Sequence, residues 1–321
     1  GFECADALRR DWGDTQFDIV VGNPPFLGQL SRLTTRGGSS PLGGGPYADA
    51  AAEFLALAVR LTRRGGRFGL VLPQSLLSAR DAAAIRADVD SRAALRWMWW
   101  SDTTMFDAAV RVWAGVWEVG GLPGEVRRAH GSEFAPLSSM PMPRTWSALL
   151  TGTDSPAHDG PCLGDIATFG VDFRAQYYGL VGAVGDDVDG PPLITSGLID
   201  PGICHWGTRP VRFAKRTFRA PRVDLTRLSP PMRRWAEGRL GPKILIANQT
   251  KVIEAVHDVD GAWLPGVPVI TCRTDQPQRV LAALSAPEAV DYVHRQVAGS
   301  GLGVGTVRLN PRLLAELPLL A

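Results

Sequence analysis

Four consecutive residues, Asn23-Pro24-Pro25-Phe26, form the strongest chemical signal in the chain. The Asn side-chain oxygen and a neighbouring backbone carbonyl offer two hydrogen-bond acceptors close together. The two prolines have no N–H group and a fixed φ, so they stiffen the loop that carries these acceptors. Phe26 adds a flat apolar face. Two acceptors beside an aromatic ring suit a planar ring that bears an exocyclic amine. A rigid turn around a buried Phe is the other interpretation of the same residues.

The motif comes directly after an apolar run, FDIVV at 17–21, which predicts a strand that ends in a turn. In open α/β sheets, ligands bind beyond the carboxyl ends of strands, so Asn23 is expected where chemistry occurs. Strand and helix signals then alternate. Helices are predicted over 47–64 and from 78 onward, and strands over 67–73, 95–100 and 110–119. This order predicts an α/β fold with a Rossmann-like sheet and a strand pair at its edge.

The chain changes character after Gly120. Between Gly120 and Gly164 it is rich in Pro, Gly and Ser, which favours a linker. Beyond this segment, short apolar runs with frequent turns surround one helical stretch at 276–297, which predicts a mostly β or α+β domain. We therefore predict a catalytic part at 1–120, a linker at 121–163 and a second domain at 164–321.

Positive charge is concentrated in the second domain. The 321-residue chain has a formal net charge of only +2, but the segment from Pro201 to Lys251 holds twelve basic and two acidic residues. Such a one-signed stretch suits a phosphate backbone, although a solvated basic face has the same composition. The residues predicted to contact such a backbone are Arg212, Lys215, Arg216, Arg219 and Lys243. The aromatic residues expected to pack beneath them are Trp206, Phe213, Phe218 and Trp235.

Composition excludes several other classes of protein. Hydrophobic residues make up 45% and charged residues 21% of the chain, which is the mix of a folded domain and not of a disordered or fibrous one. The four cysteines and five histidines lack metal-ligand spacing, so no metal is expected. No apolar run has the length of a membrane helix, and the N-terminus lacks the pattern of a signal peptide. A cytoplasmic protein with reduced thiols and no membrane partner is expected.

Three segments of the chain resemble one family. DALRRDWGDTQFDIVVGNPPF (6–26) is similar to the motif III to motif IV segment of N6-adenine DNA methyltransferases from restriction–modification systems, in particular type II and type IIG-like enzymes. The helix and strand at 47–86 look like those that follow in the family. WWSDTTMFDAAVRVWAGVWEV (99–119) is similar to its late catalytic motif. The resemblance is strongest over 5–119, and from Gly164 onward the chain resembles a DNA target recognition domain.

The resemblance implies a class I methyltransferase that moves a methyl group from S-adenosyl-L-methionine to N6 of an adenine flipped out of double-stranded DNA, without a metal. The catalytic motif would be Asn23-Pro24-Pro25-Phe26. Within it, Asn23 and Pro24 would accept the two hydrogens of the target amine. Asp6 falls on the acidic position that hydrogen-bonds the adenine amine of the cofactor. The enzyme would act at a specific site as part of a restriction–modification system.

The resemblance also implies how the flipped base is held. Phe26 would stack on one side of it and Phe106 on the other. Tyr47 and Glu53 lie in the region that lines the pocket in the family.

The chain departs from the family pattern in one respect. In the family, a glycine-rich cofactor loop and an acidic residue that binds the cofactor ribose precede the motif that holds Asp6, and the sequence starts after that point. We therefore expect an N-terminal truncation, with an N-terminal region or a partner subunit that carries the loop. The glycine run at 299–305 follows a predicted helix and precedes a predicted strand, the reverse of a cofactor loop, and is expected to be a turn.

Two alternatives stay open. A protein or ribosomal-RNA amine methyltransferase would share the Asn-Pro-Pro-aromatic motif, because glutamine and guanine amines pose the same chemical problem. Such enzymes usually lack a large domain after the catalytic fold, so the basic second half favours DNA. The other alternative is a chain without activity of its own, either a split-enzyme subunit or an inactive DNA-binding fragment.

Overall fold

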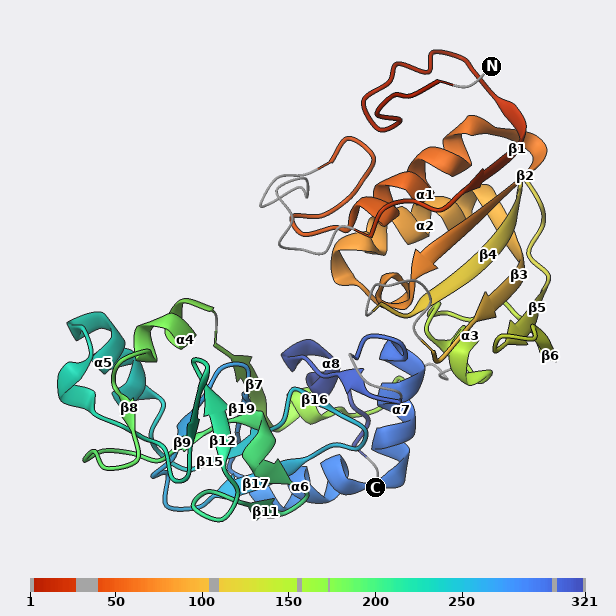
Figure 1. Ribbon diagram of the computed structural model, residues 1–321. Coiled ribbons are helices and arrows are strands. Elements are labelled where there is room, and N and C mark those ends of the chain that lie inside the picture. The colour runs from red at the N-terminus through yellow and green to blue at the C-terminus, as the bar shows by residue number, and fades with distance from the viewer. Residues whose placement is uncertain are drawn as a thin grey trace. The chain divides into compact units, whose positions relative to one another are not determined.

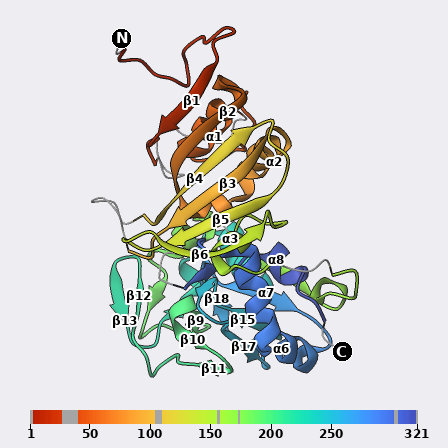
Figure 2. The same ribbon diagram turned by 90° about the vertical axis from the view of Figure 1, so that its right-hand side faces the viewer.

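The computed structural model describes residues 3–26, 40–103, 110–154, 158–172, 174–301 and 305–319. The chain divides into two compact units, which Figures 1 and 2 show from two directions. The first unit comprises Gly1–Ser155 and His294–Gly305, and the second comprises Pro156–Val293 and Thr306–Ala321. A short segment near the end of the chain therefore belongs to the first unit.

The first unit is built around a six-stranded mixed sheet in the order β1-β2-β4-β3-β5-β6. Its strands are β1 (Phe17–Gly22), β2 (Thr62–Pro73), β3 (Ala93–Trp100), β4 (Val112–Val119), β5 (Glu125–His130) and β6 (Ala135–Pro141). β1 is parallel to β2 and β3 is parallel to β5, whereas β4 runs antiparallel to both of its neighbours. The strands predicted at 17–21, 67–73, 95–100 and 110–119 are all present, with ends shifted by a few residues.

Two helices pack together on one face of this sheet (Figure 1). α1 (Ala50–Leu61) begins after Asp49, whose carboxylate accepts a hydrogen bond from Ala51 N at 2.9 Å. It ends at Thr62, whose Oγ1 donates to Ala58 O at 2.8 Å before the chain continues into β2. α2 (Ala83–Arg92) contacts α1 and β3. The capping residues explain why the apolar, alanine-rich stretch between them folds as one helix.

Aromatic side chains fill the space between these helices and the sheet. The rings of Phe68 and Trp117 stack with centroids 4.9 Å apart, and Trp113 meets Trp117 edge-on at 5.5 Å. Trp146, just before α3 (Ala148–Thr151), packs on both tryptophans and donates its indole N–H to Asp90 on α2. Each fully buried ring of this kind contributes about 2–3 kcal/mol through burial. The aromatic strands in the sequence are therefore the core of this unit.

The segment predicted as a linker, 121–163, is partly strand. β5 and β6 lie within it and extend the sheet beyond β3. Arg128 lies in β5, and an arginine in a sequence is normally expected at the surface. Its guanidinium is nevertheless buried and donates to Ser138 O and Leu149 O. Because arginine hides the strand pattern and the prolines and glycines fall at turns, composition alone pointed to a linker.

The second unit has a four-stranded antiparallel sheet in the order β17-β15-β19-β7. Its strands are β7 (Thr168–Val171), β15 (Lys243–Ile246), β17 (Ala255–Asp258) and β19 (Ile270–Arg273). Five two-stranded pairs surround it: β8 (Val184–Gly185) with β14 (Arg222–Val223), β9 (Leu193–Ile194) with β18 (Leu264–Pro265), β10 (Ile199–Asp200) with β11 (Ile203–Cys204), β12 (Val211–Phe213) with β13 (Arg216–Phe218), and β16 (Gln249–Thr250) with β20 (Val307–Arg308). The short paired strands match the predicted pattern of short apolar runs with frequent turns.

Helices of the second part of the chain are α4 (Arg174–Leu180), α5 (Pro230–Gly238), α6 (Pro277–Ser285), α7 (Pro287–Val297) and α8 (Pro311–Ala315). The helical stretch predicted at 276–297 is thus two helices. Pro287 separates them because a proline disfavours helical backbone at the residue before it, and Ala286 has an extended ψ of 137°. Among the described residues, no helix combines the length and apolar character that a membrane crossing requires.

Candidate functional site

The carboxyl ends of four strands meet at one edge of the first sheet. β1 is parallel to β2 and β3 is parallel to β5, while β4 runs opposite to both β2 and β3. The strands β1, β2, β3 and β5 therefore point the same way, and they end at Gly22, Pro73, Trp100 and His130. The residues at and just beyond these ends form the candidate site, which is where the sequence placed Asn23.

The Asn23-Pro24-Pro25-Phe26 motif leaves the sheet directly after β1. The Asn23 side chain is exposed and makes no hydrogen bond to any residue that the structure describes. Pro24 is buried, and Phe26 is half-buried against a small cluster formed by β3, β4 and β5. The two anchored residues hold the loop, while the Asn23 amide oxygen is left to accept a hydrogen bond from a ligand.

A buried glutamine, Gln74, holds the loop between β3 and β4 at its base. Its Nε2 donates to Ser101 O at 3.0 Å and to Val112 O at 3.3 Å, and its backbone N donates to Arg111 O at 2.9 Å. One residue thus fixes both ends of the loop. The predicted stacking residue Phe106 belongs to that loop and lies outside the described residues. Sequence reasoning missed Gln74, although a polar residue right after a buried strand, in LPQSLL, is a signal that could have found it.

A histidine–aspartate pair lies at the same edge. His130 ends β5, and its Nε2 is 3.1 Å from Asp102 Oδ2. The His130 ring also lies 5.1 Å from the ring of Trp100. Only the parallel pairing of β3 with β5 brings these residues together across 28 positions of sequence. The pair was therefore not predicted.

Asp6 is an exposed carboxylate in a turn of its own. Its Oδ1 accepts from Leu8 N at 3.1 Å, and its Oδ2 lies 3.4 Å from Arg9 Nε. No hydrogen bond or ion pair joins Asp6 to Asn23 within the described part of the chain. The structure therefore shows no polar contact between the predicted cofactor residue and Asn23.

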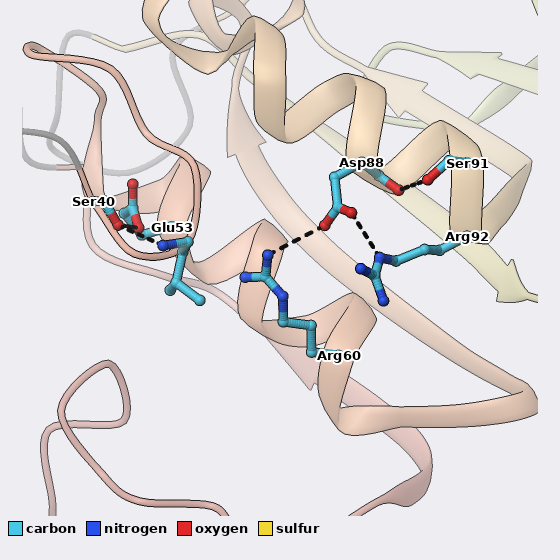
Figure 3. Close-up of polar contacts among 7 residues, drawn as sticks. Ser40, Glu53, Arg60, Asp88, Ser91 and Arg92 are labelled. Atoms are coloured by element: carbon cyan, nitrogen blue, oxygen red, sulfur yellow. Dashed lines mark hydrogen bonds and ion pairs between the residues drawn. The ribbon is translucent and has the colours of Figure 1, made fainter.

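The two pocket-lining candidates differ in burial. Tyr47 is exposed, whereas Glu53, in the first turn of α1, is buried. Figure 3 shows Glu53 accepting a hydrogen bond from the Ser40 hydroxyl. Its other oxygen, Oε1, has no hydrogen-bond partner in the described structure and lies so close to Gly44 that any larger residue there would overlap it. Glu53 thus braces the 40–44 loop against α1.

A second polar group in Figure 3 fixes α1 against α2. Asp88 on α2 accepts from Arg60 on α1 at 3.4 Å and from Arg92 at 2.7 Å, and Ser91 Oγ donates to Asp88 O at 2.7 Å. These contacts join the C-terminal turns of α1 and α2. They help to hold α1, and with it Glu53, in place behind β1.

The basic stretch of the second unit separates into paired and unpaired cations. Arg209 is paired with Asp200, Arg227 with Asp224, Arg233 with Glu237, and Arg239 with Asp172. The hydrogen bond from Arg209 lowers the pKa of Asp200 to about 2, so that carboxylate stays charged. Acids outside the stretch, Asp200 and Asp172, therefore neutralise two cations of the sequence surplus, whereas Asp224 and Glu237 are the two acids already counted within it.

Four of the five predicted DNA-binding residues lie together on an exposed hairpin. We call β12, β13 and the following Arg219 the basic hairpin. Its cations Arg212, Lys215, Arg216 and Arg219 are all exposed, and none has an ion pair with a described acid. As predicted, Phe213 and Phe218 are buried beneath, and Trp206 and Trp235 pack against the same core.

Lys243 requires a correction. It lies in β15, a central strand of the four-stranded sheet, and its Nζ is 2.6 Å from Asp258 Oδ2, with both side chains at most 2% exposed. It also donates to Gly241 O at 3.0 Å. A buried ammonium that is already paired cannot reach a DNA phosphate. We therefore remove Lys243 from the predicted DNA-binding set.

Comparisons with known proteins bear on the first unit above all. Residues 2–98 match the family model "Eco57I restriction-modification methylase". That range includes Asp6, the Asn23–Phe26 motif, β1, α1, β2 and α2. No curated protein sequence matches the chain.

A solved structure of a restriction–modification enzyme resembles the chain in fold. A type IIL restriction-modification enzyme, MmeI, solved in complex with DNA, is similar over 97% of this chain with 15% identity and a TM-score of 0.60. The methyltransferase subunit of a type I system from Streptococcus thermophilus is similar over 40% of this chain and 30% of its own, with 21% identity and a TM-score of 0.33. The chain spans 48% of the MmeI structure, about half of its length. The MmeI match shows that the chain has the fold of part of a restriction–modification enzyme.

No metal centre was predicted, and the described residues contain no group of three or more His, Cys, Asp or Glu side chains arranged to hold a metal ion. Cys272 is buried in β19, and burial raises its pKa to about 12, so it stays protonated.

Proposed function

We propose that the chain is the catalytic and target-recognition part of a site-specific DNA adenine-N6 methyltransferase of a restriction–modification system. The observation that carries this proposal is the Asn23 side chain. It stands exposed at the carboxyl end of β1 without a partner among the described residues, three positions before the anchored Phe26. The match of residues 2–98 to the restriction–modification methylase family supports it.

The proposed mechanism addresses the low nucleophilicity of the adenine amine. Its lone pair is delocalised into the ring, which makes it a poor nucleophile. Hydrogen bonds from both N–H groups to the Asn23 side chain and the Pro24 carbonyl favour a more tetrahedral nitrogen and aim the lone pair at an incoming methyl group. Because the amine becomes acidic only as the new bond forms, no strong base is needed beforehand. Holding the two reactants in line supplies several kcal/mol of the barrier reduction.

The base must leave the duplex before Asn23 can reach it. Flipping costs a few kcal/mol. Stacking on an aromatic ring is worth about 1–3 kcal/mol per base, so the half-buried Phe26 and the predicted Phe106 offset that cost together. Gln74 contributes indirectly, because its hydrogen bonds fix both ends of the loop that carries Phe106.

S-adenosylmethionine, when bound, supplies the methyl group as a sulfonium. The described residues fit one end of it: the exposed Asp6 carboxylate can accept a hydrogen bond from the adenine amine of the cofactor. The apolar edge of the sheet also suits a further chain segment. Ile19 and Val21 of the edge strand β1 are 70% and 78% exposed. Beside them a groove of about 450 Å³ runs over the face opposite α1 and α2, lined by Val21, Gly22, Gly69, Leu70, Val71, Trp97, Ala114, Gly115 and Val116. We propose that an N-terminal region or a subunit with the cofactor loop covers it.

Residues 1–321 alone are therefore expected to bind S-adenosylmethionine weakly, with a Kd of about 1 mM or higher, which corresponds to about −4 kcal/mol. Asp6 offers one contact, and the proposal assigns the methionine and ribose contacts to the additional segment. Isothermal titration calorimetry of the chain measures this directly. Micromolar binding would contradict the proposed division of the site. An in-frame F-x-G-x-G segment in the gene upstream of residue 1 would support it.

Double-stranded DNA is the proposed partner of the basic hairpin. Replacing Arg212, Lys215, Arg216 and Arg219 by Ala is expected to weaken binding to all duplex sequences alike. The slope of log binding constant against log salt concentration should become less negative by about 0.9 for each phosphate that the variant no longer binds. The measurement is a fluorescence-anisotropy titration over a salt series. The whole chain is used, because the second unit is assembled from two separate stretches of sequence.

A charge-matched variant provides the control for this titration. Replacing Arg227, Arg233, Arg279 and Arg312 removes the same number of cations from the same unit. Three of these arginines already face acids: Arg227 faces Asp224, Arg233 faces Glu237 and Arg312 faces Glu316. A slope that changes equally in both variants would show that net charge, and not the basic hairpin, sets the affinity.

The reaction itself is tested by mass spectrometry of digested duplex DNA. The duplex DNA is first incubated with S-adenosylmethionine and an active enzyme. This enzyme is the shortest polypeptide that contains residues 1–321 and has methyltransferase activity. N6-methyladenine at one sequence context is expected. Methylated cytosine would contradict the proposal, and methyl transfer to ribosomal RNA or to protein glutamine in place of DNA would favour the alternative amine methyltransferase.

A further inference from the structure

The two faces of the basic hairpin differ in chemistry. Val211 pairs with Phe218 across the hairpin, and both are buried in the core of the second unit. Arg212 pairs with Thr217 on the opposite, exposed face. The hairpin therefore uses its apolar face to attach to the unit and presents a polar, positively charged face outward. A carboxylate at its base, Asp186, binds the backbone N–H groups of residues 219 and 220 and so leaves the guanidinium of Arg219 without an acidic partner among the described side chains.

The turn of the hairpin has an unusual backbone. Ala214 and Lys215 both have positive φ, 47° and 67°. Tight hairpin turns need this geometry, but Asn and Gly normally supply it. For residues with a side chain, such a conformation is costly and persists only when its surroundings hold it. It places Lys215 at the tip, where its ammonium is exposed.

A tyrosine on α4 holds this turn. The hydroxyl of Tyr177 accepts a hydrogen bond from Ala214 N at 3.1 Å, and its ring lies 4.8 Å from the ring of Phe213. Tyr177 thus fixes the turn from beneath through both its polar and its apolar part.

The next residue of α4, Tyr178, is exposed and contacts Tyr177. Tyr178 is 60% exposed, and its ring packs edge-on against Tyr177 with centroids 5.4 Å apart. The contact with Tyr177 limits the positions of the Tyr178 ring while leaving much of its surface accessible. Tyr178 is thus joined through Tyr177 to a hairpin whose cations have no ion pair with a described acid. Nucleic acids bind such a combination, because cations meet phosphates and aromatic rings meet bases.

We propose that Tyr178 contacts a base of the target DNA and sets part of the recognition sequence, and that Tyr177 is the positioning residue for the basic hairpin. The inference rests on the proposed function, in that DNA is taken as the partner. A two-stranded β-ribbon fits the major groove of B-DNA, where base edges differ from pair to pair. The cations of the hairpin then fix its register on the phosphates, and Tyr178 supplies a contact that depends on sequence.

The test selects preferred sites from a pool of duplex DNA with randomised sequence, using the full chain at fixed salt. The unmodified chain is expected to enrich a defined motif. Tyr178→Ala is expected to lose the preference at one or two positions of that motif and to bind the best site about tenfold more weakly, the usual effect of one mismatched base pair. Its salt slope is expected to stay unchanged. Tyr178→Phe, which keeps the ring, is expected to retain the preference.

Val259→Ala is the matched control, because Val259 is also largely exposed in the second unit but stands between Asp258 and Asp260. It is expected to leave both motif and affinity unchanged. If Tyr178→Ala enriches the same motif as the unmodified chain, the role of Tyr178 is overturned while DNA binding stands. If the unmodified chain binds no duplex DNA, the proposed function fails together with this inference.

The positioning role of Tyr177 has a separate readout. Tyr177→Phe removes the hydroxyl that holds Ala214 N and is expected to weaken binding about threefold to tenfold, a typical loss for one hydrogen bond, with the enriched motif unchanged. Adding Ala214→Gly to this variant is expected to restore affinity, since glycine adopts the positive φ at little cost. Failure of the second substitution to restore affinity, or a changed motif in Tyr177→Phe, would overturn the positioning role.

Discussion

Replacing Asn23 with Ala is expected to lower the rate of methyl transfer to adenine by about 100- to 1000-fold, the usual effect of removing one group that stabilises charge in a transition state. The Asn23 oxygen is proposed to accept a hydrogen bond that strengthens as the amine nitrogen becomes positive. Its loss should therefore appear in kcat more than in the affinity for DNA. The measurement is transfer of a radiolabelled methyl group to duplex DNA under single-turnover conditions, using the shortest active polypeptide that contains residues 1–321.

The structure separates this catalytic effect from an effect on folding. Asn23 is exposed and makes no hydrogen bond to the described residues, so Asn23→Ala is expected to change the free energy of unfolding by no more than about 0.5 kcal/mol. Asn23→Asp keeps an acceptor oxygen at the same place and is expected to retain more activity than Asn23→Ala. Equal rates for the Ala variant and the unmodified enzyme, or a large loss of stability in it, would show that the motif is only a rigid turn.

Local patterns were enough to predict the elements that present this motif. The apolar run before Asn23 is β1, the alanine-rich segment after it is α1, and both are formed by side chains that contact near neighbours in sequence. The parallel direction of β1 and β2 also followed from the alternation of strand and helix, and it places Asn23 at the carboxyl edge of the sheet. The strand pair expected at the edge, β3 and β4, instead lies in the middle of the sheet. Fold class and the position of the motif were therefore accessible without the structure.

Features that depend on distant pairs were not accessible. Gln74 acquires its role from carbonyls 27 and 38 positions away, and His130 meets Asp102 only through the pairing of β3 with β5. The strands β5 and β6 were predicted as a linker. The sequence does not show the contacts that bury Arg128 in β5, so this arginine looked like a surface residue. In each case the structural role of a polar residue depends on partners that are distant in sequence.

The basic stretch shows the same limit in the charge pattern. A count of residues treats every cation alike, but acids outside the stretch neutralise Arg209, Arg239 and Lys243. What remains exposed and without an ion pair to a described acid includes the contiguous basic hairpin, which lies within the stretch that the count of cations indicated. Only the structure, which shows the neighbours of each cation, distinguishes the hairpin cations from those that are paired with acids.

Lys243 gives the second large effect that we expect. Lys243→Met keeps the length of the side chain but removes the ammonium from Asp258, which is then left charged in the interior. Breaking a buried ion pair in this way typically lowers the free energy of unfolding by about 3–5 kcal/mol. The backbone N–H groups of Ala262 and Trp263 still donate to Asp258, at 3.1 and 3.0 Å, so a value toward the lower end is expected. Urea unfolding followed by tryptophan fluorescence measures it.

Two further variants test this interpretation of Lys243. Arg233→Met breaks an exposed pair with Glu237 and is expected to change stability by less than about 1 kcal/mol. Combining Lys243→Met with Asp258→Asn removes both charges and is expected to cost less than the sum of the single changes, because no unpaired charge is left buried. At a temperature where the Lys243→Met chain is folded, its DNA affinity should show the same salt slope as the unmodified chain. Unchanged stability with a flatter slope would instead place Lys243 on the DNA and return it to the predicted contacts.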